Sequence, residues 1–403
     1  MNKILNNKLI MFILLMFYFK PICLQYYSKL NLVEKVFIYG KIAVAAFIML
    51  IVFIDIIKKQ KIKINKLLIT MGIFESITFV ITLFNNGFIN RIIIDYVTIV
   101  TFFLLLNILY KVNKIKLIDT LKFLFFICIT LQLISELIYP LGMDADLYLN
   151  NKFNLLFFMT LDNGITDLTC LSIVIMELFL KLDNNSNSKL KHIYYILCIL
   201  TAYFSGSTTA LLSTLALILS CYIIKLKELK LFEYKYIWIL IYIIIFINLL
   251  DTNGFFSNLF FKLTGKEGFT GRTYLWERAI VMIKNAPLFG YGVQEKGYLN
   301  VWGGYFSSHN VILEIMLQSG IIGLFSWLIM LIVGVSNIKK IKSRHLKRLF
   351  VISIFIILCT LLMESVTQSI YLWLLLTLIN LVEHDSELGE SSGRISKCSN
   401  TSV

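Results

Sequence analysis

The amino-acid sequence predicts an all-α polytopic membrane protein, with about 12 transmembrane helices and a large folded extracytoplasmic loop between the ninth and the tenth. The first observation is composition: 58% of the 403 residues are apolar and 15% are charged, whereas about 25% of a soluble domain is charged. The second is that the apolar residues form runs, many near the ~20 residues that cross a bilayer as a helix. The third is that basic residues cluster between these runs. A soluble enzyme, a disordered chain, a coiled coil and a collagen-like repeat are excluded.

The predicted helices divide the chain into four parts. Residues 1–251 hold the first nine spans, residues 252–308 form the loop, and residues 309–382 hold the last three spans. The tail, residues 383–403, is polar and Ser-rich, and we expect it to be disordered. The twelve spans are expected at about residues 9–27, 36–57, 67–84, 89–110, 117–139, 163–182, 192–204, 207–224, 236–251, 309–336, 349–363 and 366–382.

The distribution of Lys and Arg predicts which loops face the cytoplasm. Alternate loops on one side carry 21 Lys and Arg residues, and those on the other carry 11, six of them in the loop 252–308. Cytoplasmic loops of membrane proteins carry the excess of basic residues. We therefore expect a multi-pass protein of the plasma or inner membrane, with both termini in the cytoplasm and residues 252–308 outside.

Charge and cysteine content exclude other classes of protein. The net charge of +14 does not predict nucleic-acid binding, because the basic residues sit in short clusters between apolar runs. The seven cysteines include no CxxC pair, so neither a disulfide framework nor a zinc site is expected. No cleavable signal peptide is expected either, since no small-residue cleavage site follows the first apolar run.

A helix in the long loop carries the first candidate site residues. Over residues 271–287, apolar residues recur three, four and seven positions after Trp276, which is the pattern of an amphipathic helix that Pro287 ends. Arg272 is expected in its first turn, where a cation is disfavoured unless an anion binds. Free N–H groups and a guanidinium fork fit a pyrophosphate there. The same pattern also fits a surface helix with incidental charges.

The chain then re-enters the membrane through two short motifs. Residues 287–292 read PLFGYG, which is typical of a tight turn. His309 and Asn310 follow at the mouth of the tenth span, and His309 is the one histidine of four that is expected on the outer side. Imidazole titrates near neutral pH, so His309 is a candidate general base or hydroxyl-orienting group. An interfacial residue that caps the span is the alternative.

Taken in order, these motifs resemble the signature of the O-antigen ligase and O-antigen polymerase (Wzy-type) family. The order is Gly271-Arg272, Trp276, P-x-x-G-x-G at 287–292, His309-Asn310, and Gly320-x-x-Gly323 within a span, so that the likeness covers about residues 265–330. The resemblance implies a polytopic enzyme with a large extracytoplasmic loop. Such an enzyme transfers a glycan from a polyprenyl-pyrophosphate carrier to an acceptor hydroxyl, without a nucleotide sugar, a metal or another cofactor.

The resemblance also implies roles for particular residues. Arg272 matches the family's loop arginine, which is expected to bind the pyrophosphate. His309 matches its essential histidine, which is expected to activate or orient the acceptor hydroxyl. Family members often carry a Ser-Arg pair at the outer end of an earlier span, but this chain has Ser207-Thr208 there. The remaining candidates for substrate binding are Trp276, Asn310 and the outer-side cations Arg91, Lys266 and Arg278, the last of which is expected to face away from Arg272.

A competing motif, Asp144-Ala145-Asp146, lies in the outer segment 140–162. Such a pair can hold a divalent cation on a sugar-phosphate donor. Two acids in a polar loop are more often solvated, so no metal ligand is assigned.

The predicted function is polymerisation of undecaprenyl-pyrophosphate-linked oligosaccharide repeat units into a capsular or O-antigen-like surface polysaccharide, by metal-independent inverting transfer at the outer face of the membrane. Expected partners are the lipid-linked donor and acceptor, the bilayer, a flippase and a chain-length regulator, and nucleic acid is not expected. One alternative is a ligase that moves finished polysaccharide to another acceptor. The other is a polysaccharide transporter or flippase, which is disfavoured because transporters use broken helices and Pro21 is the one proline of three within a span.

Overall fold

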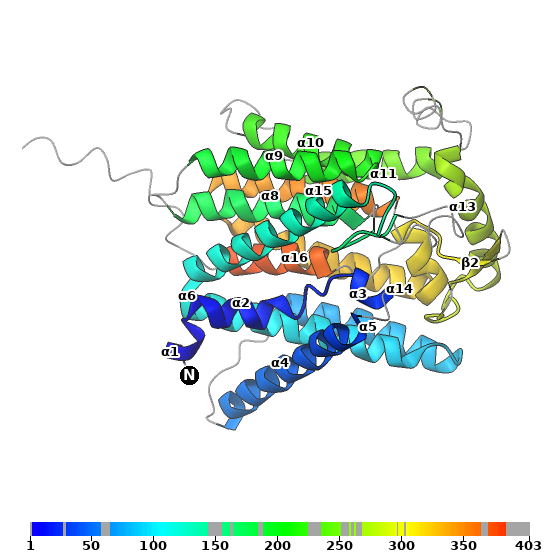
Figure 1. The fold of residues 1–403 in the computed structure, drawn as a ribbon. Coiled ribbons are helices and arrows are strands. Elements are labelled where there is room, and N and C mark those ends of the chain that lie inside the picture. Colours follow the sequence, from blue (N-terminus) through cyan, green and yellow to red (C-terminus); the bar gives the residue numbers. More distant parts are fainter. Residues whose placement is uncertain are drawn as a thin grey trace, which may run out of the picture.

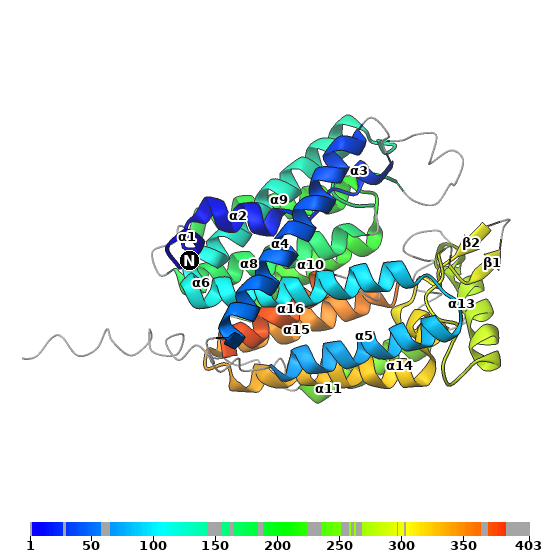
Figure 2. The same ribbon diagram turned by 90° about the horizontal axis from the view of Figure 1, so that it is seen from below.

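The computed structural model describes residues 2–26, 30–57, 65–143, 155–161, 164–183, 188–224, 235–250, 268–295, 297–301, 304–363 and 370–383, together with Asn258 and Lys262. The described chain is an all-α bundle in which most helices run side by side along one direction (Figures 1 and 2). The predicted tail lies outside the described residues, apart from Glu383 at the end of the last helix. The all-α prediction is confirmed.

Each predicted apolar run contains helix. The helices are α1 Asn2–Leu5, α2 Lys8–Met16, α3 Cys23–Tyr26, α4 Asn31–Ile57, α5 Lys66–Phe84, α6 Ile89–Ile138, α8 Ile165–Leu182, α9 Ser188–Phe204, α10 Thr208–Ile223, α11 Lys235–Leu250, α13 Gly268–Asn285, α14 Val311–Ser336, α15 Arg344–Leu361 and α16 Ile370–Glu383. A short antiparallel hairpin joins β1 Leu299–Val301 to β2 Gly304–Phe306.

Four of the described helices are long and apolar enough to cross a membrane, namely Asn31–Ile54, Lys66–Phe84, Ile89–Ile138 and Val311–Lys340. Large apolar side chains such as Phe53, Val80 and Ile332 are exposed on them. An apolar surface of this kind is stable in lipid, whereas its exposure to water would be unfavourable in free energy. The helices therefore indicate a polytopic membrane protein, while the count of twelve spans stays a prediction.

The prediction of one continuous first helix over residues 9–27 is wrong. Helix α2 ends at Met16, and α3 begins only at Cys23. Pro21 lies between them, and a proline removes one helical hydrogen bond and clashes with the preceding turn. The break also lets the ammonium group of Lys20 contact the Glu34 carboxylate at 2.7 Å.

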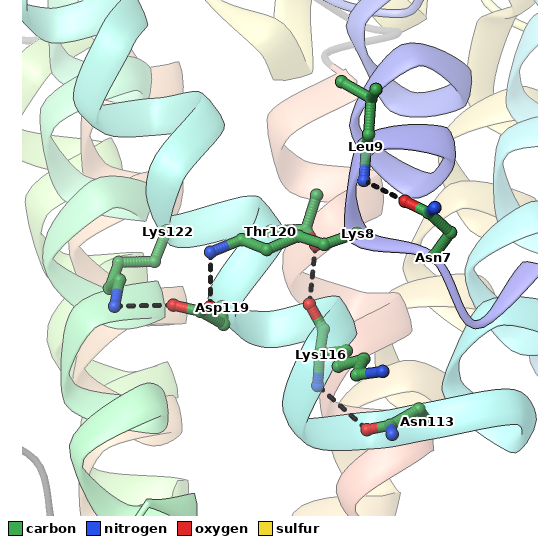
Figure 3. Close-up of polar contacts among 8 residues, drawn as sticks. All are labelled: Asn7, Lys8, Leu9, Asn113, Lys116, Asp119, Thr120 and Lys122. Atoms are coloured by element: carbon green, nitrogen blue, oxygen red, sulfur yellow. Dashed lines mark hydrogen bonds and ion pairs between the residues drawn. The ribbon is translucent and has the colours of Figure 1, made fainter.

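Helix α6 contains a sharp bend at Asn113, which separates the two predicted spans on either side of residues 111–116. The amide oxygen of Asn113 accepts the N–H of Lys116 at 3.0 Å and so caps the second half of the helix. One turn later, Asp119 bridges Lys8 and Lys122 at 2.5 and 2.7 Å (Figure 3). This network joins α2 to α6 at one end of the bundle.

Helix α8 forms the centre of the bundle, because nearly all of its side chains are buried. The hydroxyl groups of Thr169 and Thr214 lie 2.8 Å apart and connect α8 to α10. Glu177 is 3% exposed. Its carboxylate pairs with Lys191, accepts a hydrogen bond from the Tyr195 hydroxyl at 2.5 Å and lies 3.2 Å from His345 Nε2. A buried charge is tolerated when it is paired in this way.

The two ends of the bundle differ. Helix α13 and the β1–β2 hairpin lie across one end (Figures 1 and 2). The turn between α5 and α6 is at this end too, since the backbone N–H of Phe88 donates to the carbonyl of Val293 at 2.8 Å. The opposite end holds α1, and the bend at Asn113 lies there too, since the Asn113 amide nitrogen donates to Asn6 Oδ1 at 3.2 Å. The candidate site residues of the loop that the structure describes, in α13 and in the turn before α14, therefore belong to one end of the molecule.

Candidate active site

A second apolar cluster, separate from the main core, holds the candidate site together. It joins α13 to the hairpin and to the first turns of α14. Its buried members are Leu275, Trp276, Ala279, Tyr298, Leu299, Val301, Leu313, Leu317 and Leu362. This end of the protein is therefore packed around its own core rather than formed by plain connecting loops.

Helix α13 is amphipathic, as the periodicity predicts. Trp276 and Ala279 are buried in the second cluster, and the helix ends at Asn285, two residues before Pro287. The placement of Arg272 in the first turn is wrong, because the helix begins at Gly268 and Arg272 is its fifth residue. Helical glycines cost about 1 kcal/mol each, and burial of the apolar face offsets that cost.

The PLFGYG segment forms more than a tight turn, because it fills a break in helix α14. Gly320 has φ +60° and ψ −161°, which interrupts the helix. The N–H groups of Tyr291 and Gly292 donate to the carbonyls of Leu317 and Gln318 at 2.7 and 2.9 Å. In return, the N–H of Ile321 donates to Pro287 O at 2.9 Å. The turn thus supplies the hydrogen bonds that the broken helix loses.

This contact leaves no space for side chains at two glycines. A Cβ atom on Gly320 would lie 2.2 Å from the Leu288 carbonyl oxygen, and one on Gly290 would lie 2.5 Å from the Leu317 carbonyl oxygen. Both residues have positive φ. The expectation that broken helices are absent is therefore wrong: the break is made by glycine and an inserted turn, whereas the expectation considered proline alone.

The same turn contacts helix α5. The N–H of Val293 donates to the Thr82 hydroxyl at 2.8 Å, and the Thr78 and Ser319 hydroxyls lie 3.0 Å apart across α5 and α14. The hydroxyl of Tyr298 donates to Gly292 O at 2.7 Å. Burial raises the pKa of this phenol well above its usual value, so it stays a neutral donor. Helix α14 is consequently fixed on two sides.

His309 lies in a strained turn that starts helix α14. Its φ is +48°, a left-handed conformation that is uncommon for residues other than glycine. Its neighbours Ser308 and Asn310 are both fully buried, whereas His309 is partly exposed. The amide oxygen of Asn310 accepts the N–H groups of Ile312 and Leu313 at 3.0 and 3.2 Å. The predicted capping role thus falls on Asn310, while His309 is partly exposed and its Nδ1 is buried.

The amide nitrogen of Asn310 is buried and has no hydrogen-bond partner among the described residues. A buried donor of this kind costs about 1–3 kcal/mol if it stays unsatisfied. Its presence beside His309 fits a site that is completed by a bound polar group.

Glu314 is a residue of this site that the sequence interpretation missed. It is 5% exposed, and its Oε2 accepts the Ser308 N–H at 2.8 Å. The Ser308 hydroxyl lies 2.8 Å from the same oxygen and 2.9 Å from the Asn310 carbonyl oxygen. The carboxylate also interacts electrostatically with His309. The sequence does contain a signal for Glu314, because an acidic residue one turn inside an apolar run is often functional.

Two of the three outer-side cations, Arg91 and Arg278, lie within the described residues. Arg91 begins α6 beside the turn, pairs with Asp95 at 3.7 Å and contributes to the electrostatic environment of Tyr298. Arg278 is exposed and donates to the Tyr274 hydroxyl at 3.0 Å, so it lies away from the buried side of α13. Lys266 lies outside the described residues.

Of the two remaining sequence motifs, one lies within the described residues. Ser207 caps helix α10 by accepting the N–H of Ala210 at 3.3 Å, which is a structural role. Asp144 and Asp146 lie outside the described residues. Within the part of the chain that the structure describes, no three His, Cys, Asp or Glu side chains gather around a metal site.

The arrangement combines a partly exposed histidine, buried hydrogen-bond donors and a helix with an arginine, at one end of a membrane bundle. Residues 193–328 match a family model described as O-antigen ligase. The match extends from α9 into α14, and so includes α13, the hairpin and the His309 turn. A comparison with curated proteins gave no match. The resemblance found in the sequence is confirmed: residues 193–328 are similar to the O-antigen ligase family.

Proposed function

We propose that the protein polymerises undecaprenyl-pyrophosphate-linked oligosaccharide repeat units into a surface polysaccharide, capsular or O-antigen-like. The observation that carries the proposal is the His309 turn, which lies inside the matched domain and presents a partly exposed histidine between buried Ser308 and Asn310. Reaction at the outer face follows from the charge bias of the loops, which also places both termini in the cytoplasm.

The proposed reaction is a single displacement. The acceptor hydroxyl oxygen attacks the anomeric carbon of the donor sugar, and the bond from that carbon to the pyrophosphate oxygen breaks. Polyprenyl pyrophosphate leaves with the electron pair, and the hydroxyl proton passes to His309, which later releases it to water. The anomeric centre is inverted.

A pyrophosphate is already a good leaving group, so the enzyme has to hold and neutralise it rather than protonate it. Arg272 is the proposed contact, because a guanidinium group binds phosphate oxygens in pairs. Arg91 is the proposed second cation, because it follows Phe88, whose N–H donates to the Val293 carbonyl, and because it acts electrostatically on Tyr298. The amide nitrogen of Asn310 and the ring of Trp276 are proposed to help position the sugars.

A ligase is the second candidate, because the matching family model is described by that activity. It would use the same residues and differ only in its acceptor. A transporter or flippase is less favoured. The break in α14 is filled by the turn at Pro287–Gly292, so it does not leave unwound backbone lining a passage of the kind that transporters use.

Purified protein supplied with one lipid-linked repeat unit distinguishes the two enzymes. A polymerase holds two copies of that unit and is expected to produce a ladder of multiples on a gel. A ligase leaves the unit unchanged until a different acceptor is added. Single transfer to a foreign acceptor, with no dimer of the repeat unit, would exclude the polymerase and retain the lipid-linked transferase.

A further inference from the structure

The carboxylate of Glu314 is buried one helical turn below His309, and the proposed reaction gives it no role. It is 5% exposed, in a segment that otherwise reads as an apolar span. Acidic side chains at such positions are costly and are usually functional. The capping of α14 does not require it, because Asn310 already caps the first two free N–H groups.

Two contacts of Glu314 reach Ser308, the residue before His309, and a third is a side-chain hydrogen bond with Gln318 one turn further along α14. Its Oε2 accepts the Ser308 backbone N–H at 2.8 Å and lies 2.8 Å from the Ser308 hydroxyl. The backbone carbonyl of Asn310 accepts the N–H of Glu314 at 2.8 Å, so both sides of His309 are tied to the same turn of helix. A left-handed φ of +48° persists only where surrounding contacts enforce it.

We propose that Glu314 is the positioning residue of the active site, which holds the Ser308–Asn310 turn so that the His309 imidazole faces the acceptor hydroxyl. Its carboxyl group also interacts electrostatically with His309. When the imidazole takes the hydroxyl proton it becomes a cation, and a fixed carboxylate nearby stabilises that cation and the transition state that leads to it. This role rests on the proposed transfer to a sugar hydroxyl.

The test compares Glu314→Gln with Glu277→Gln. Glutamine keeps the size of the side chain and an oxygen that can accept the Ser308 N–H, but it removes the charge. Glu277 is an exposed acid on α13, so its variant makes the same chemical change in the same region away from the turn. Activity is measured per folded protein, as glycosidic bonds formed from a lipid-linked repeat unit over a range of its concentration.

For Glu314→Gln we expect kcat to fall by roughly 10- to 100-fold while KM changes little. This loss is smaller than the whole contribution of a positioned acid or base to a reaction rate, which is roughly 10²- to 10⁴-fold. Glu277→Gln is expected to match the wild type. A purely structural Glu314 would instead lower the folded yield and leave kcat per folded molecule unchanged, and that result would overturn the proposal.

Ser308→Ala provides a second variant in case Glu314→Gln folds poorly. It removes the hydroxyl contact but keeps the backbone N–H contact, and a severalfold loss of kcat at normal folded yield is expected. Unchanged kcat in Ser308→Ala would count against the positioning role. If wild-type protein forms no glycosidic bond, the proposed function fails as well. If His309→Ala is inactive while Glu314→Gln is fully active, only the positioning role fails.

Discussion

Replacement of His309 by alanine is expected to abolish polymer formation while the protein stays folded. The side chain is partly exposed and belongs to neither apolar core, so its loss removes chemistry rather than packing. A general base contributes roughly 10²- to 10⁴-fold to a rate. Polymer is measured in cells that depend on this protein for its synthesis, with protein amount determined by immunoblot.

His192→Ala is the matched control. His192 is exposed, its Nδ1 lies 3.2 Å from the Tyr222 hydroxyl, and it belongs to a basic cluster outside the candidate site. Arg272→Ala should resemble His309→Ala, and Arg272→Lys should also be poor because a point charge loses the paired phosphate contact. If His309→Ala and Arg272→Ala both formed long polymer, the assigned site would be wrong.

Gly320→Ala is expected to have an effect of similar size by a different route. The new Cβ would lie 2.2 Å from the Leu288 carbonyl oxygen, at a residue whose φ is +60°. The left-handed conformation alone costs about 1–3 kcal/mol for a residue with a side chain, and the clash adds to this. The PLFGYG turn would be pushed out of the break, and the helix that carries Asn310 would lose its support.

The change is measured as loss of the monodisperse peak in detergent, of thermal stability and of polymer. Gly72→Ala in α5 is the control, because the nearest atom to its Cβ would be the Tyr96 hydroxyl at 3.6 Å, an ordinary contact. Normal stability and normal polymer in Gly320→Ala would mean that the turn does not fill the break in the functional protein.

The helices were predictable from sequence because lipid imposes a simple requirement on them. Each spanning segment must satisfy its own backbone hydrogen bonds and present apolar side chains, so composition and length suffice to find it. The boundary at the bend in α6 was predictable for the same reason, since Lys residues and Asn113 interrupt the apolar run. The early end of α2 was missed because the run continues through Pro21, although proline cannot continue the helix.

The break in α14 could not be predicted, because its cause lies elsewhere in the chain. Nothing around Gly320 requires a non-helical residue, and glycine is common in membrane helices. The break exists because the N–H groups of Tyr291 and Gly292 satisfy the carbonyls that it frees. Such pairing depends on tertiary structure.

The candidate site was only partly predictable for related reasons. His309, Asn310 and Arg272 could be selected from residue type and order, since each carries recognisable chemistry. Glu314 was missed because its importance comes from a contact with Ser308, six residues earlier, across a left-handed turn. The position of Arg272 in α13 differs from the prediction because the helix starts at Gly268 and includes two glycines, which usually mark a helix end rather than its interior.

The central claim is that a polyprenyl-pyrophosphate-linked sugar is the glycosyl donor. The most direct measurement counts polyprenyl pyrophosphate released and glycosidic bonds formed by purified protein, given only the lipid-linked repeat unit, without nucleotide sugar and with EDTA present. One molecule of polyprenyl pyrophosphate is expected for each bond. Bond formation that requires a nucleotide sugar, that is lost in EDTA and restored by magnesium or manganese, or that releases no polyprenyl pyrophosphate would contradict it.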